Sequence, residues 1–255
     1  MNDIFDLHGH HALVTGASSG LGQHFALVLA RAGADVALAA RRVENCEQTA
    51  AAIKALGRRA VAVEMDVTDA ASVGAAVDTA IAALGPITIL CNNAGMAITK
   101  RFLDMEEADW DKVLDTNLKG AYLVAHAIAR HMAAHGKGGS IINTASVLSF
   151  GVAKQLSSYM ASKAALMHLT RAMATELAQN NIRVNALAPG YIETEINRDF
   201  FKTEGGKAVI KRVPQRRLGQ PEDLDGTLLL LASDAGRYIT GSAITVDGGH
   251  SVSPL

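Results

Sequence analysis

Hydrophobic residues along the chain fall into short apolar runs that alternate with longer, Ala-rich stretches of helical period. Several of the short runs are apolar at successive positions, as expected of parallel strands that helices cover on both faces. Strands are predicted at residues 11–15, 35–39, 60–64, 87–91, 140–144, 182–187 and 243–246. Helices are predicted between them at residues 20–32, 43–56, 70–84, 106–135, 157–179 and 221–233.

This alternation predicts an α/β fold, a single Rossmann-type doubly wound domain with a seven-stranded parallel sheet and helices on both faces. No Pro/Ser-rich linker, composition break or internal repeat divides the sequence, so residues 1–255 are expected to form one domain. Segment 193–220 does not fit the alternation, because it is long and carries few strand signals. It follows the carboxyl end of a predicted strand, where ligands bind in such sheets, and we predict a loop that acts as a substrate lid.

Composition and charge limit the classes of function. The 255 residues are 49% hydrophobic and 19% charged, with a net charge of −1. This composition is typical of a packed domain and supplies no overall positive field for nucleic acid. Apolar runs stay shorter than the roughly 20 residues of a membrane helix, the N-terminal sequence has no signal-peptide pattern, and Cys46 and Cys91 indicate no disulfide framework. We therefore expect a cytoplasmic protein that binds neither nucleic acid nor membrane.

The segment TGASSGLG at residues 15–22 connects the first predicted strand to the first predicted helix. Its glycines allow a sharp turn and a close approach to a pyrophosphate, and the helix N-terminus supplies free N–H groups. A glycine triplet is also compatible with an ordinary tight turn, but its position in a strand–helix–strand series favours a dinucleotide site. The residues expected to bind the cofactor here are Gly16, Ser18, Ser19, Gly20, Leu21 and Gly22.

The end of the second predicted strand indicates which dinucleotide binds. An NAD site usually carries an acid there for the ribose 2′-hydroxyl, whereas this strand runs into Arg41 and Arg42, and Asp35 stands at its opposite end. Guanidinium groups bind a 2′-phosphate through paired hydrogen bonds. We predict that NADP(H) is preferred over NAD(H), mainly through Arg41. The alternative is that both arginines form the solvated start of the next helix.

Tyr159 and Lys163 are four residues apart in a predicted helix, so their side chains share one face. A neighbouring ammonium stabilises a phenolate and lowers the pKa of a tyrosine, which then exchanges a proton with a carbonyl oxygen more readily. The same spacing also occurs on ordinary helix faces. Ser146 strengthens the catalytic interpretation, because it follows the strand at 140–144 and can hydrogen-bond a substrate oxygen. A nucleophilic Ser146 is the competing interpretation, but no Gly-x-Ser-x-Gly motif surrounds it.

Two asparagine-containing segments add to this pattern. The sequence NNAG at residues 92–95 follows a predicted strand and reaches the same edge of the sheet. Asn117 lies inside the predicted helix 106–135, although asparagine is a poor helix former. A local break in the helix or a water site would explain it.

Together these motifs make the sequence similar to the classical short-chain dehydrogenases/reductases over essentially its whole length. The matching positions are TGASSGLG at 15–22, Asp66-Val67 after the third predicted strand, NNAG at 92–95, Asn117 in TNLKG, Ser146, Tyr159 with Lys163, and Pro189-Gly190 followed by Thr194. Family members are commonly tetramers that pack through the helices at 106–135 and 157–179, so the resemblance implies a homotetramer. No motif places a set of metal ligands, and no metal is expected.

The resemblance implies a catalytic role for four residues. Tyr159 would be the general acid/base, and Lys163 would lower its pKa and hold the nicotinamide ribose. Ser146 would position and polarise the substrate oxygen, and Asn117 would hold a water in a proton relay.

The resemblance also implies further cofactor contacts. Asp66 and Val67 would contact the adenine, and Thr194 and the backbone of Ile192 would anchor the carboxamide. Arg41 matches the basic residue of NADP-preferring members, whereas the family's second basic position, in the glycine turn, is a serine here. The other cofactor-binding positions implied by the family motifs are Asn93, Ala94, Gly95, Tyr159, Lys163, Pro189 and Gly190.

The expected reaction is hydride transfer between the nicotinamide and a small-molecule ketone or secondary alcohol. Our first interpretation is a 3-oxoacyl-type or general carbonyl reductase, which the region from Ser146 to Tyr159 and a basic segment at 198–217 favour. The alternative is a sugar-acid or polyol dehydrogenase of the gluconate type, because the opening NDIFDLHGHHALVTG is similar to such members. Against it, residues 147–158 lack the acidic and arginine pattern associated with them.

Two further alternatives concern the same residues. A dinucleotide-sensing regulator without turnover is a third interpretation, which the presence of Ser146, Tyr159 and Lys163 disfavours. Segment 198–217 carries seven Lys/Arg residues against two Asp/Glu, so it either attracts an anionic substrate or is a solvated loop.

Overall fold

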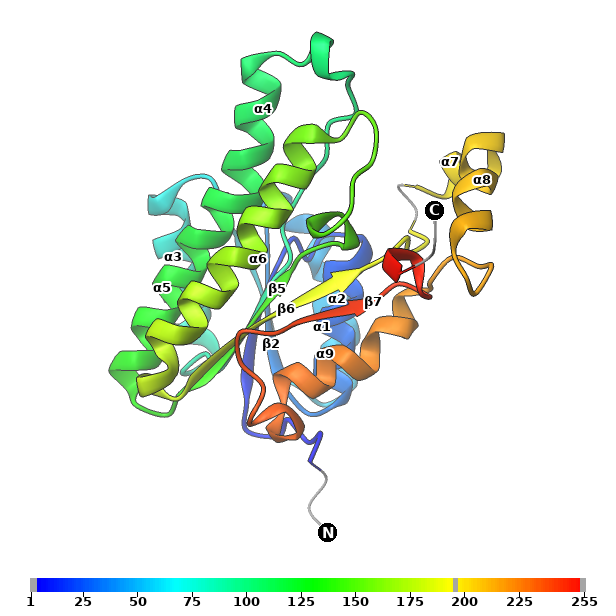
Figure 1. The fold of residues 1–255 in the computed structure, drawn as a ribbon. Coiled ribbons are helices and arrows are strands. Elements are labelled where there is room, and N and C mark those ends of the chain that lie inside the picture. Colours follow the sequence, from blue (N-terminus) through cyan, green and yellow to red (C-terminus); the bar gives the residue numbers. More distant parts are fainter. Residues whose placement is uncertain (1–3, 195–196, 253–255) are drawn as a thin grey trace.

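The computed structural model describes residues 4–194 and 197–252, and within these ranges seven strands form one parallel sheet. The strand order is β3-β2-β1-β4-β5-β6-β7 (Figure 1). The strands are β1 His11–Thr15, β2 Asp35–Ala40, β3 Ala60–Glu64, β4 Ile89–Asn92, β5 Gly139–Thr144, β6 Ile182–Pro189 and β7 Ala243–Val246. The predicted Rossmann-type sheet is confirmed. Because the strand order reverses between β1 and β4, the sheet has its switch point there, where such folds bind dinucleotides.

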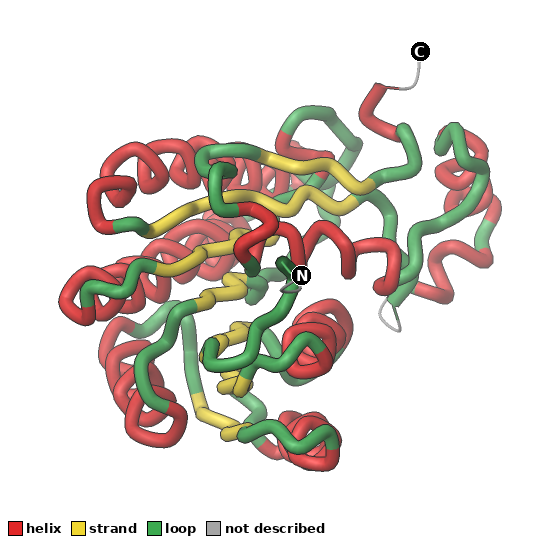
Figure 2. Tube along the Cα trace, turned by 90° about the horizontal axis from the view of Figure 1, so that it is seen from below, coloured by secondary structure: helices red, strands yellow, loops and turns green. Residues whose placement is uncertain are grey.

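Helices cover both faces of the sheet, so that the strands form the middle layer in Figure 2. Helices α1 (Gly20–Arg31), α2 (Glu44–Ala55) and α9 (Asp225–Ala232) pack on one face. Helices α3 (Ala70–Leu84), α5 (Gly120–His135) and α6 (Ser157–Leu177) pack on the other.

The five inner strands, β1, β2, β4, β5 and β6, are buried on both faces because alternate residues enter two separate cores. In β1, Val14 packs into the core under α1, whereas its neighbour Leu13 packs into the core under α5. Phe25 and Leu29 fill the first core, and Ile128 fills the second, all fully buried. This double burial explains why the strands read as continuous apolar runs in the sequence.

The single helix predicted at 106–135 is wrong in one respect. The structure has α4 (Glu107–Leu114), a π-helical turn at Asp115–Lys119, and then α5. The turn contains Asn117, so at this asparagine the helix changes to a wider turn but is not broken, and the water site stays a prediction. Short π-helical segments inside helices often occur at functional sites.

Segment 193–220 is not the loop that the sequence predicted. It contains α7 (Arg198–Lys202) and α8 (Glu204–Arg212), and residues 195–196 lie outside the described residues. The Thr203 hydroxyl begins α8 by accepting a hydrogen bond from the N–H of Gly206 at 3.2 Å. Both helices stand beyond the carboxyl ends of the strands in Figure 1.

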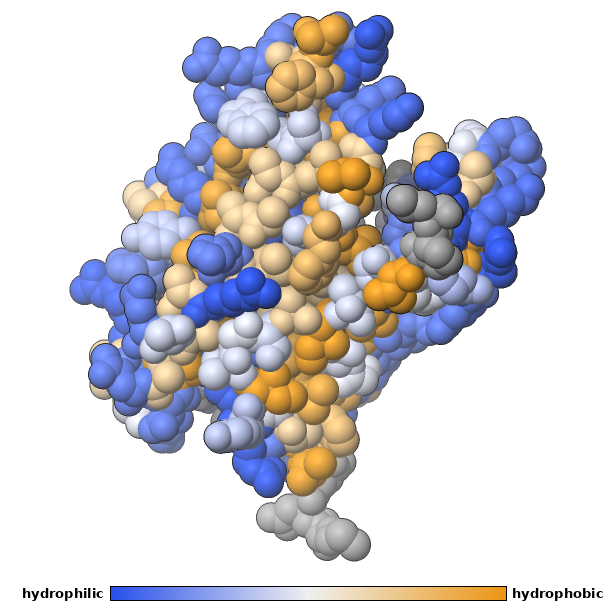
Figure 3. All heavy atoms as spheres, viewed as in Figure 1, coloured by the Kyte–Doolittle hydropathy of each residue, from blue (hydrophilic) through white to orange (hydrophobic). Residues whose placement is uncertain are grey.

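The surface in Figure 3 separates apolar from polar regions. Apolar side chains cross the middle of this face, over α6 and β7, and hydrophilic side chains cover α7 and α8. Among the described residues, no helix combines the length and the apolar character needed to cross a membrane.

Candidate active site

The glycine turn between β1 and α1 has a backbone that requires glycine. Gly16 and Gly20 have φ angles of +66° and +57°, in the left-handed region. A Cβ atom on Gly22 would lie 2.2 Å from the carbonyl oxygen of Gly16. The turn therefore closes against the first turn of α1, and the helix N-terminus faces the cleft above the sheet.

That cleft collects most of the predicted cofactor residues at the carboxyl ends of β1 to β4. It is lined by Gly16, Ser18, Ser19, Gly20, Leu21, Ala40, Arg41, Arg42, Met65, Asp66, Val67, Thr68, Asn93, Ala94, Gly95, Met96, Thr116 and Thr194. Gly22 lies beneath the turn, outside the lining. Five lining residues were not predicted from the sequence: Ala40, Met65, Thr68, Met96 and Thr116. Met65 and Thr68 flank the predicted pair Asp66-Val67 and were detectable.

Charged groups in the cleft agree with the prediction made at the end of β2. Arg41 and Arg42 are exposed there, and the positive charge of Arg41 helps to lower the pKa of Asp66. The larger cause is hydrogen bonding, since Asp66 accepts bonds from the N–H and hydroxyl of Thr68 at 2.9 and 2.8 Å. Asp35 lies at the other end of β2 and pairs with Arg58 at 2.9 Å, away from the cleft.

The NNAG segment is fixed to the end of β1 by Thr15. The Thr15 hydroxyl accepts hydrogen bonds from the N–H groups of Asn93 and Ala94 at 2.9 and 3.0 Å. The Asn93 amide in turn donates to the Thr15 carbonyl at 3.1 Å. Thr15 is therefore a structural residue of the site, a role that was not predicted from the sequence.

A second cavity continues from the cleft along the carboxyl ends of β5 and β6. It shares Leu21, Asn93, Gly95, Met96 and Thr194 with the cleft. Its other lining residues are Ala97, Thr144, Ala145, Ser146, Tyr159, Lys163, Pro189, Gly190, Tyr191, Ile192 and Asn197. The structure thus brings Ser146, Tyr159 and Lys163 together beside the cofactor cleft. We call this second space the catalytic cavity.

Tyr159 and Lys163 are influenced mainly by burial. Burial raises the pKa of Tyr159, and hydrogen bonding with Ser146 opposes that effect in part. The Lys163 ammonium lies 5.8 Å from the centre of the Tyr159 ring and donates a hydrogen bond to the Thr144 carbonyl at 2.6 Å. Burial lowers the pKa of Lys163 to about 8. The lowered pKa expected for Tyr159 is thus not found in this structure, because burial outweighs the groups that favour phenolate.

Asn117 is fully buried beside the cavity rather than in its lining. Its amide oxygen accepts from the N–H of Met96 at 2.8 Å, and its amide nitrogen donates to the Met96 carbonyl at 2.8 Å. The same nitrogen donates to the Ser162 hydroxyl at 3.0 Å, and Ser162 donates to the carbonyl of Tyr159 at 2.7 Å. Asn117 therefore connects the segment after β4 to α6, and its relay role stays a prediction.

The residues expected to anchor the carboxamide are connected by a side chain that the sequence did not single out. The Asn197 amide oxygen accepts from the N–H of Thr194, and its nitrogen donates to the Ile192 carbonyl, both at 2.8 Å. Gly190 packs so closely on Asp247 that a Cβ atom would lie 2.7 Å from its Cα. These contacts fix the segment that leaves β6.

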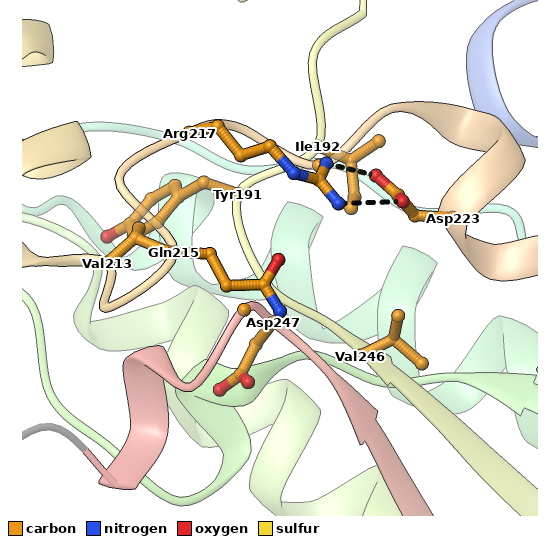
Figure 4. A pocket seen from close by; sticks show the side chains of 10 residues that line it. Tyr191, Ile192, Val213, Gln215, Arg217, Asp223, Val246 and Asp247 are labelled. Atoms are coloured by element: carbon orange, nitrogen blue, oxygen red, sulfur yellow. Dashed lines mark hydrogen bonds and ion pairs between the residues drawn. The ribbon is translucent and has the colours of Figure 1, made fainter.

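A third cavity, shown in Figure 4, lies on the other side of Tyr191 and Ile192. Arg217 and Asp223 form a two-bond ion pair at its rim, with distances of 2.5 and 2.9 Å. This pair lowers the pKa of Asp223 to about 2. Since Tyr191 and Ile192 line both spaces, they form the wall between this cavity and the catalytic cavity.

Comparisons with known proteins place this geometry in a family. A family model described as enoyl-(acyl carrier protein) reductase matches residues 16–251. The 2-dehydro-3-deoxy-D-gluconate 5-dehydrogenase of Escherichia coli K12 is 43% identical over 246 residues, which are 96% of each chain. A short-chain type dehydrogenase/reductase from Mycobacterium marinum superposes with a TM-score of 0.93 at 43% identity, over 97% of this chain and 98% of the other.

A third similarity includes a bound cofactor. The gluconate 5-dehydrogenase of Burkholderia cenocepacia J2315, solved in complex with NADP and tartrate, superposes with a TM-score of 0.94 at 38% identity over 99% of both chains. These similarities extend over the whole sheet, the cofactor cleft and the catalytic cavity, and they confirm the resemblance inferred from the motifs. The chain therefore belongs to the classical short-chain dehydrogenase/reductase family of oxidoreductases.

Proposed function

We propose that this protein is an NADP(H)-dependent dehydrogenase that interconverts a secondary alcohol and a ketone on a sugar acid. The observation that carries the proposal is the convergence of Ser146, Tyr159 and Lys163 in one cavity that continues into the cofactor cleft. A non-catalytic regulator is disfavoured, because it would have no need for all three groups at one point.

Of the two substrate classes considered from the sequence, we now favour the alternative, the sugar acids, over 3-oxoacyl compounds. The relatives from E. coli and B. cenocepacia are named for gluconate-type substrates and match nearly the full chain. The family model is described by an acyl reductase activity, but the same family contains these sugar-acid relatives. The opening sequence was therefore a better guide to the substrate than the region between Ser146 and Tyr159.

The residues present fit NADP(H). The glycine turn leaves no room for a side chain at Gly22, and the exposed guanidinium of Arg41 stands in the cleft where a 2′-phosphate is expected. Gly16, Ser18 to Leu21, Asn93 to Gly95 and Thr194 would hold the dinucleotide. When bound, the nicotinamide ring accepts a hydride from the alcohol carbon or returns one to the ketone carbon.

The protein supplies the proton chemistry at the substrate oxygen. Ser146 donates a hydrogen bond to that oxygen, and Tyr159 removes the hydroxyl proton during oxidation or delivers it during reduction. Because burial favours the neutral phenol of Tyr159, this residue already carries the proton that reduction of the ketone requires. In the oxidation direction, the charge of Lys163 stabilises the phenolate that must form first.

Three predictions made from the sequence belong to the same proposal. The chain would act as one domain, with segment 193–220 as a lid beside the catalytic cavity, which Asn197 lines. It would assemble as a homotetramer, an arrangement that the partly exposed edge strand β7 supports. The two buried free thiols, Cys46 and Cys91, are compatible with the cytoplasm.

A substrate panel tests the proposal. Purified protein is assayed with NADP⁺ and NAD⁺ against D-gluconate and related sugar acids, and with NADPH against their keto forms and acetoacetyl thioesters. We expect turnover of sugar acids with NADP(H), and none by Tyr159→Phe, which should still bind NADPH. Turnover of acetoacetyl thioesters alone would refute the substrate class, and turnover by Tyr159→Phe would refute the site.

A further inference from the structure

The segment that leaves β6 is held from two sides. On one side Ile192 pairs with Gly219 in an isolated parallel bridge. The N–H of Gly219 donates to the Tyr191 carbonyl at 2.9 Å, and the N–H of Glu193 donates to the Gly219 carbonyl at 2.8 Å. In such a pairing, the N–H and the carbonyl of the central residue point away from the partner strand. Both groups of Ile192 therefore point away from Gly219 and the cavity of Figure 4, toward the catalytic cavity that Ile192 also lines.

On the other side, the Asn197 side chain takes one backbone group from each of two residues. Its Nδ2 donates to the Ile192 carbonyl and its Oδ1 accepts from the N–H of Thr194, both at 2.8 Å. The orientation of this amide follows from its partners, since a carbonyl only accepts and an N–H only donates. The backbone N–H of Asn197 also donates to the Thr194 carbonyl at 3.2 Å, so the side chain is held in place.

Two groups on this segment stay available to a ligand. Within residues 4–194 and 197–252, the N–H of Ile192 and the hydroxyl of Thr194 make no hydrogen bond. Both residues line the catalytic cavity. A carboxamide has an acceptor oxygen and a donor NH₂ group, which match the Ile192 N–H and the Thr194 hydroxyl. These are the residues that the family resemblance assigns to the nicotinamide carboxamide.

The groups that Asn197 occupies suit the same kind of ligand. Its side chain is itself a carboxamide, and its two bonds show that the Ile192 carbonyl and the Thr194 N–H can bind one such group together. If both were free, the nicotinamide carboxamide could bind them with its NH₂ toward Ile192 and its oxygen toward Thr194. That arrangement is turned by half a turn, and a ring that turns with its carboxamide presents the opposite face to the substrate.

Resting on the proposed NADP(H) function, we propose that Asn197 is a positioning residue for the nicotinamide. By occupying the Ile192 carbonyl and the Thr194 N–H, it leaves a single pair of partners for the carboxamide. One orientation of the ring is then favoured, and the hydride leaves from or arrives at one face only. Asn197 acts through Ile192 and Thr194, so its effect belongs to the nicotinamide end of the cofactor and not to the adenine end.

Helices α7 and α8 hold together through contacts that do not involve Asn197. Gly206 of α8 packs so closely on α7 that a Cβ atom would lie 2.4 Å from the Cα of Phe201. As far as the described residues go, four of the seven cations of segment 198–217 form ion pairs: Arg198–Glu193 at 3.2 Å, Lys202–Asp199 at 2.8 Å, Lys207–Glu204 at 2.7 Å and Arg217–Asp223 at 2.5 Å. Loss of the Asn197 side chain should therefore leave both helices folded.

The face of hydride transfer tests the proposal directly. Wild-type protein and Asn197→Ala reduce 5-keto-D-gluconate, or the keto acid of the panel that the wild-type protein reduces best, with NADPH deuterated at either face of C4. Mass spectrometry then measures the deuterium in the product. Wild-type protein should transfer deuterium from one of the two forms only. Asn197→Ala should make about one transfer in ten from the other face, a ratio that corresponds to roughly one hydrogen bond. Transfer that stays on one face in Asn197→Ala would overturn the proposal.

Binding of two nucleotides shows where Asn197 acts. NADPH reaches both ends of the site, whereas 2′,5′-ADP carries the adenine ribose and its 2′-phosphate but no nicotinamide. Asn197→Ala should raise the Kd of NADPH about five- to tenfold and leave the Kd of 2′,5′-ADP within about twofold. Asn197→Asp keeps the acceptor for the Thr194 N–H but loses the donor to the Ile192 carbonyl, so its Kd for NADPH should lie between.

Thr203→Ala is the matched control, because the Thr203 hydroxyl also makes two hydrogen bonds, to the Gly206 N–H and the Phe200 carbonyl at the start of α8. It should leave both Kd values within about twofold. An equal loss of NADPH binding in Thr203→Ala, or an equal loss of both nucleotides in Asn197→Ala, would overturn the assignment of Asn197. Wild-type protein that binds neither nucleotide would instead refute the proposed cofactor, and this outcome is visible before any variant is made.

Discussion

At the scale of single residues, the ends of the strands decide which charges meet the cofactor. Arg41 follows β2 directly and is exposed in the cleft, whereas Asp35 begins the same strand and is occupied by Arg58 and Arg59 at 2.9 and 2.8 Å. Asp35 therefore cannot accept a hydrogen bond from the ribose 2′-hydroxyl, as the acid of an NAD-specific site would. This separation of the two charges along β2 underlies the expected preference for NADP(H).

Replacing Arg41 tests that preference. In Arg41→Asp the carboxylate repels a 2′-phosphate and can accept a hydrogen bond from a 2′-hydroxyl instead. We expect the ratio of kcat/KM with NADP⁺ to that with NAD⁺ to fall by at least about 100-fold, since a charge-assisted pair is exchanged for a repulsion. Arg42→Asp is the neighbouring control and should change the ratio less. Equal ratios in wild-type and Arg41→Asp protein would remove Arg41 from the site.

Lys163 gives a prediction about pH and stability. Burial lowers its pKa from 10.5 to about 8, so the folded protein releases this proton before the unfolded chain does. Below pH 8 the buried ammonium lowers the free energy of unfolding by its full amount. This loss of stability disappears as the pH rises from about 8 toward 10.5, because the folded protein has then released the proton. Relative to Lys163→Met, wild-type protein should therefore gain stability between these two pH values, by up to about 3 kcal/mol.

Denaturant unfolding measures this difference, with the single tryptophan, Trp110, as the fluorescent probe. Both proteins are unfolded at pH 7.5 and at the highest pH where they remain folded, and the exposed Lys154→Met serves as control. A difference in stability that stays constant with pH would show that Lys163 does not titrate in this way. The comparison needs no cofactor, so it separates the environment of Lys163 from its role in turnover.

At the scale of elements, local sequence pattern was a sufficient guide wherever an element depends on its own residues. All seven strands lie close to where the apolar runs predicted them. For the five inner strands, β1, β2, β4, β5 and β6, burial on both faces leaves a strong local signal. The interruption at Asn117 was harder to specify, since it depends on hydrogen bonds to Met96, 21 residues away in the chain. Helices α7 and α8 were missed because they are short and pack on each other, with Gly206 of α8 close against Phe201 of α7, and α7 in turn contacts Tyr191.

The turn between β1 and α1 offers a test at this scale. A Cβ atom at Gly22 would lie 2.2 Å from the Gly16 carbonyl oxygen and 2.7 Å from the Asn93 amide, and the first of these is backbone. Gly22→Ala should lower the free energy of unfolding by about 1–3 kcal/mol and weaken NADPH binding, because the turn must open.

Gly74→Ala is the matched control for that change. Gly74 lies inside α3, and a Cβ atom there would meet nothing within 4 Å. Alanine should therefore stabilise the helix by roughly 0.5–1 kcal/mol and leave NADPH binding unchanged. If Gly22→Ala were as stable and bound NADPH as tightly as Gly74→Ala, the close packing of the turn would not matter.

At the scale of the whole molecule, the sequence predicted the sheet and the location of the site but not its charge balance. Counting residues gave segment 198–217 a strongly positive character, whereas Glu193 and Asp223 reach into it from outside and neutralise two of its arginines. Likewise, Tyr191 in the wall between the two cavities contacts Phe201 of α7 and also His250. Phe201 and His250 are far from each other in the sequence. Such pairings require the fold before they can be recognised.

Assembly is the prediction that belongs to this scale. Strand β7 lies at the edge of the sheet, and its residues are at most partly buried, unlike those of β2. A homotetramer would cover such an edge, and sedimentation should then give four times the 26.7 kDa chain mass at micromolar concentration. A single species of one chain mass over the whole concentration range would contradict this assembly.

The ion pairs of segment 198–217 also bear on how an anionic substrate arrives. Long-range steering depends on the net field of a surface, and ionic strength weakens it. With Arg198, Lys202, Lys207 and Arg217 each facing an acid, the field that extends into the solvent is much weaker than seven cations would give. An acid should then reach the cavity at an ordinary diffusional rate and feel attraction only on close approach. Added salt should therefore slow its capture only slightly.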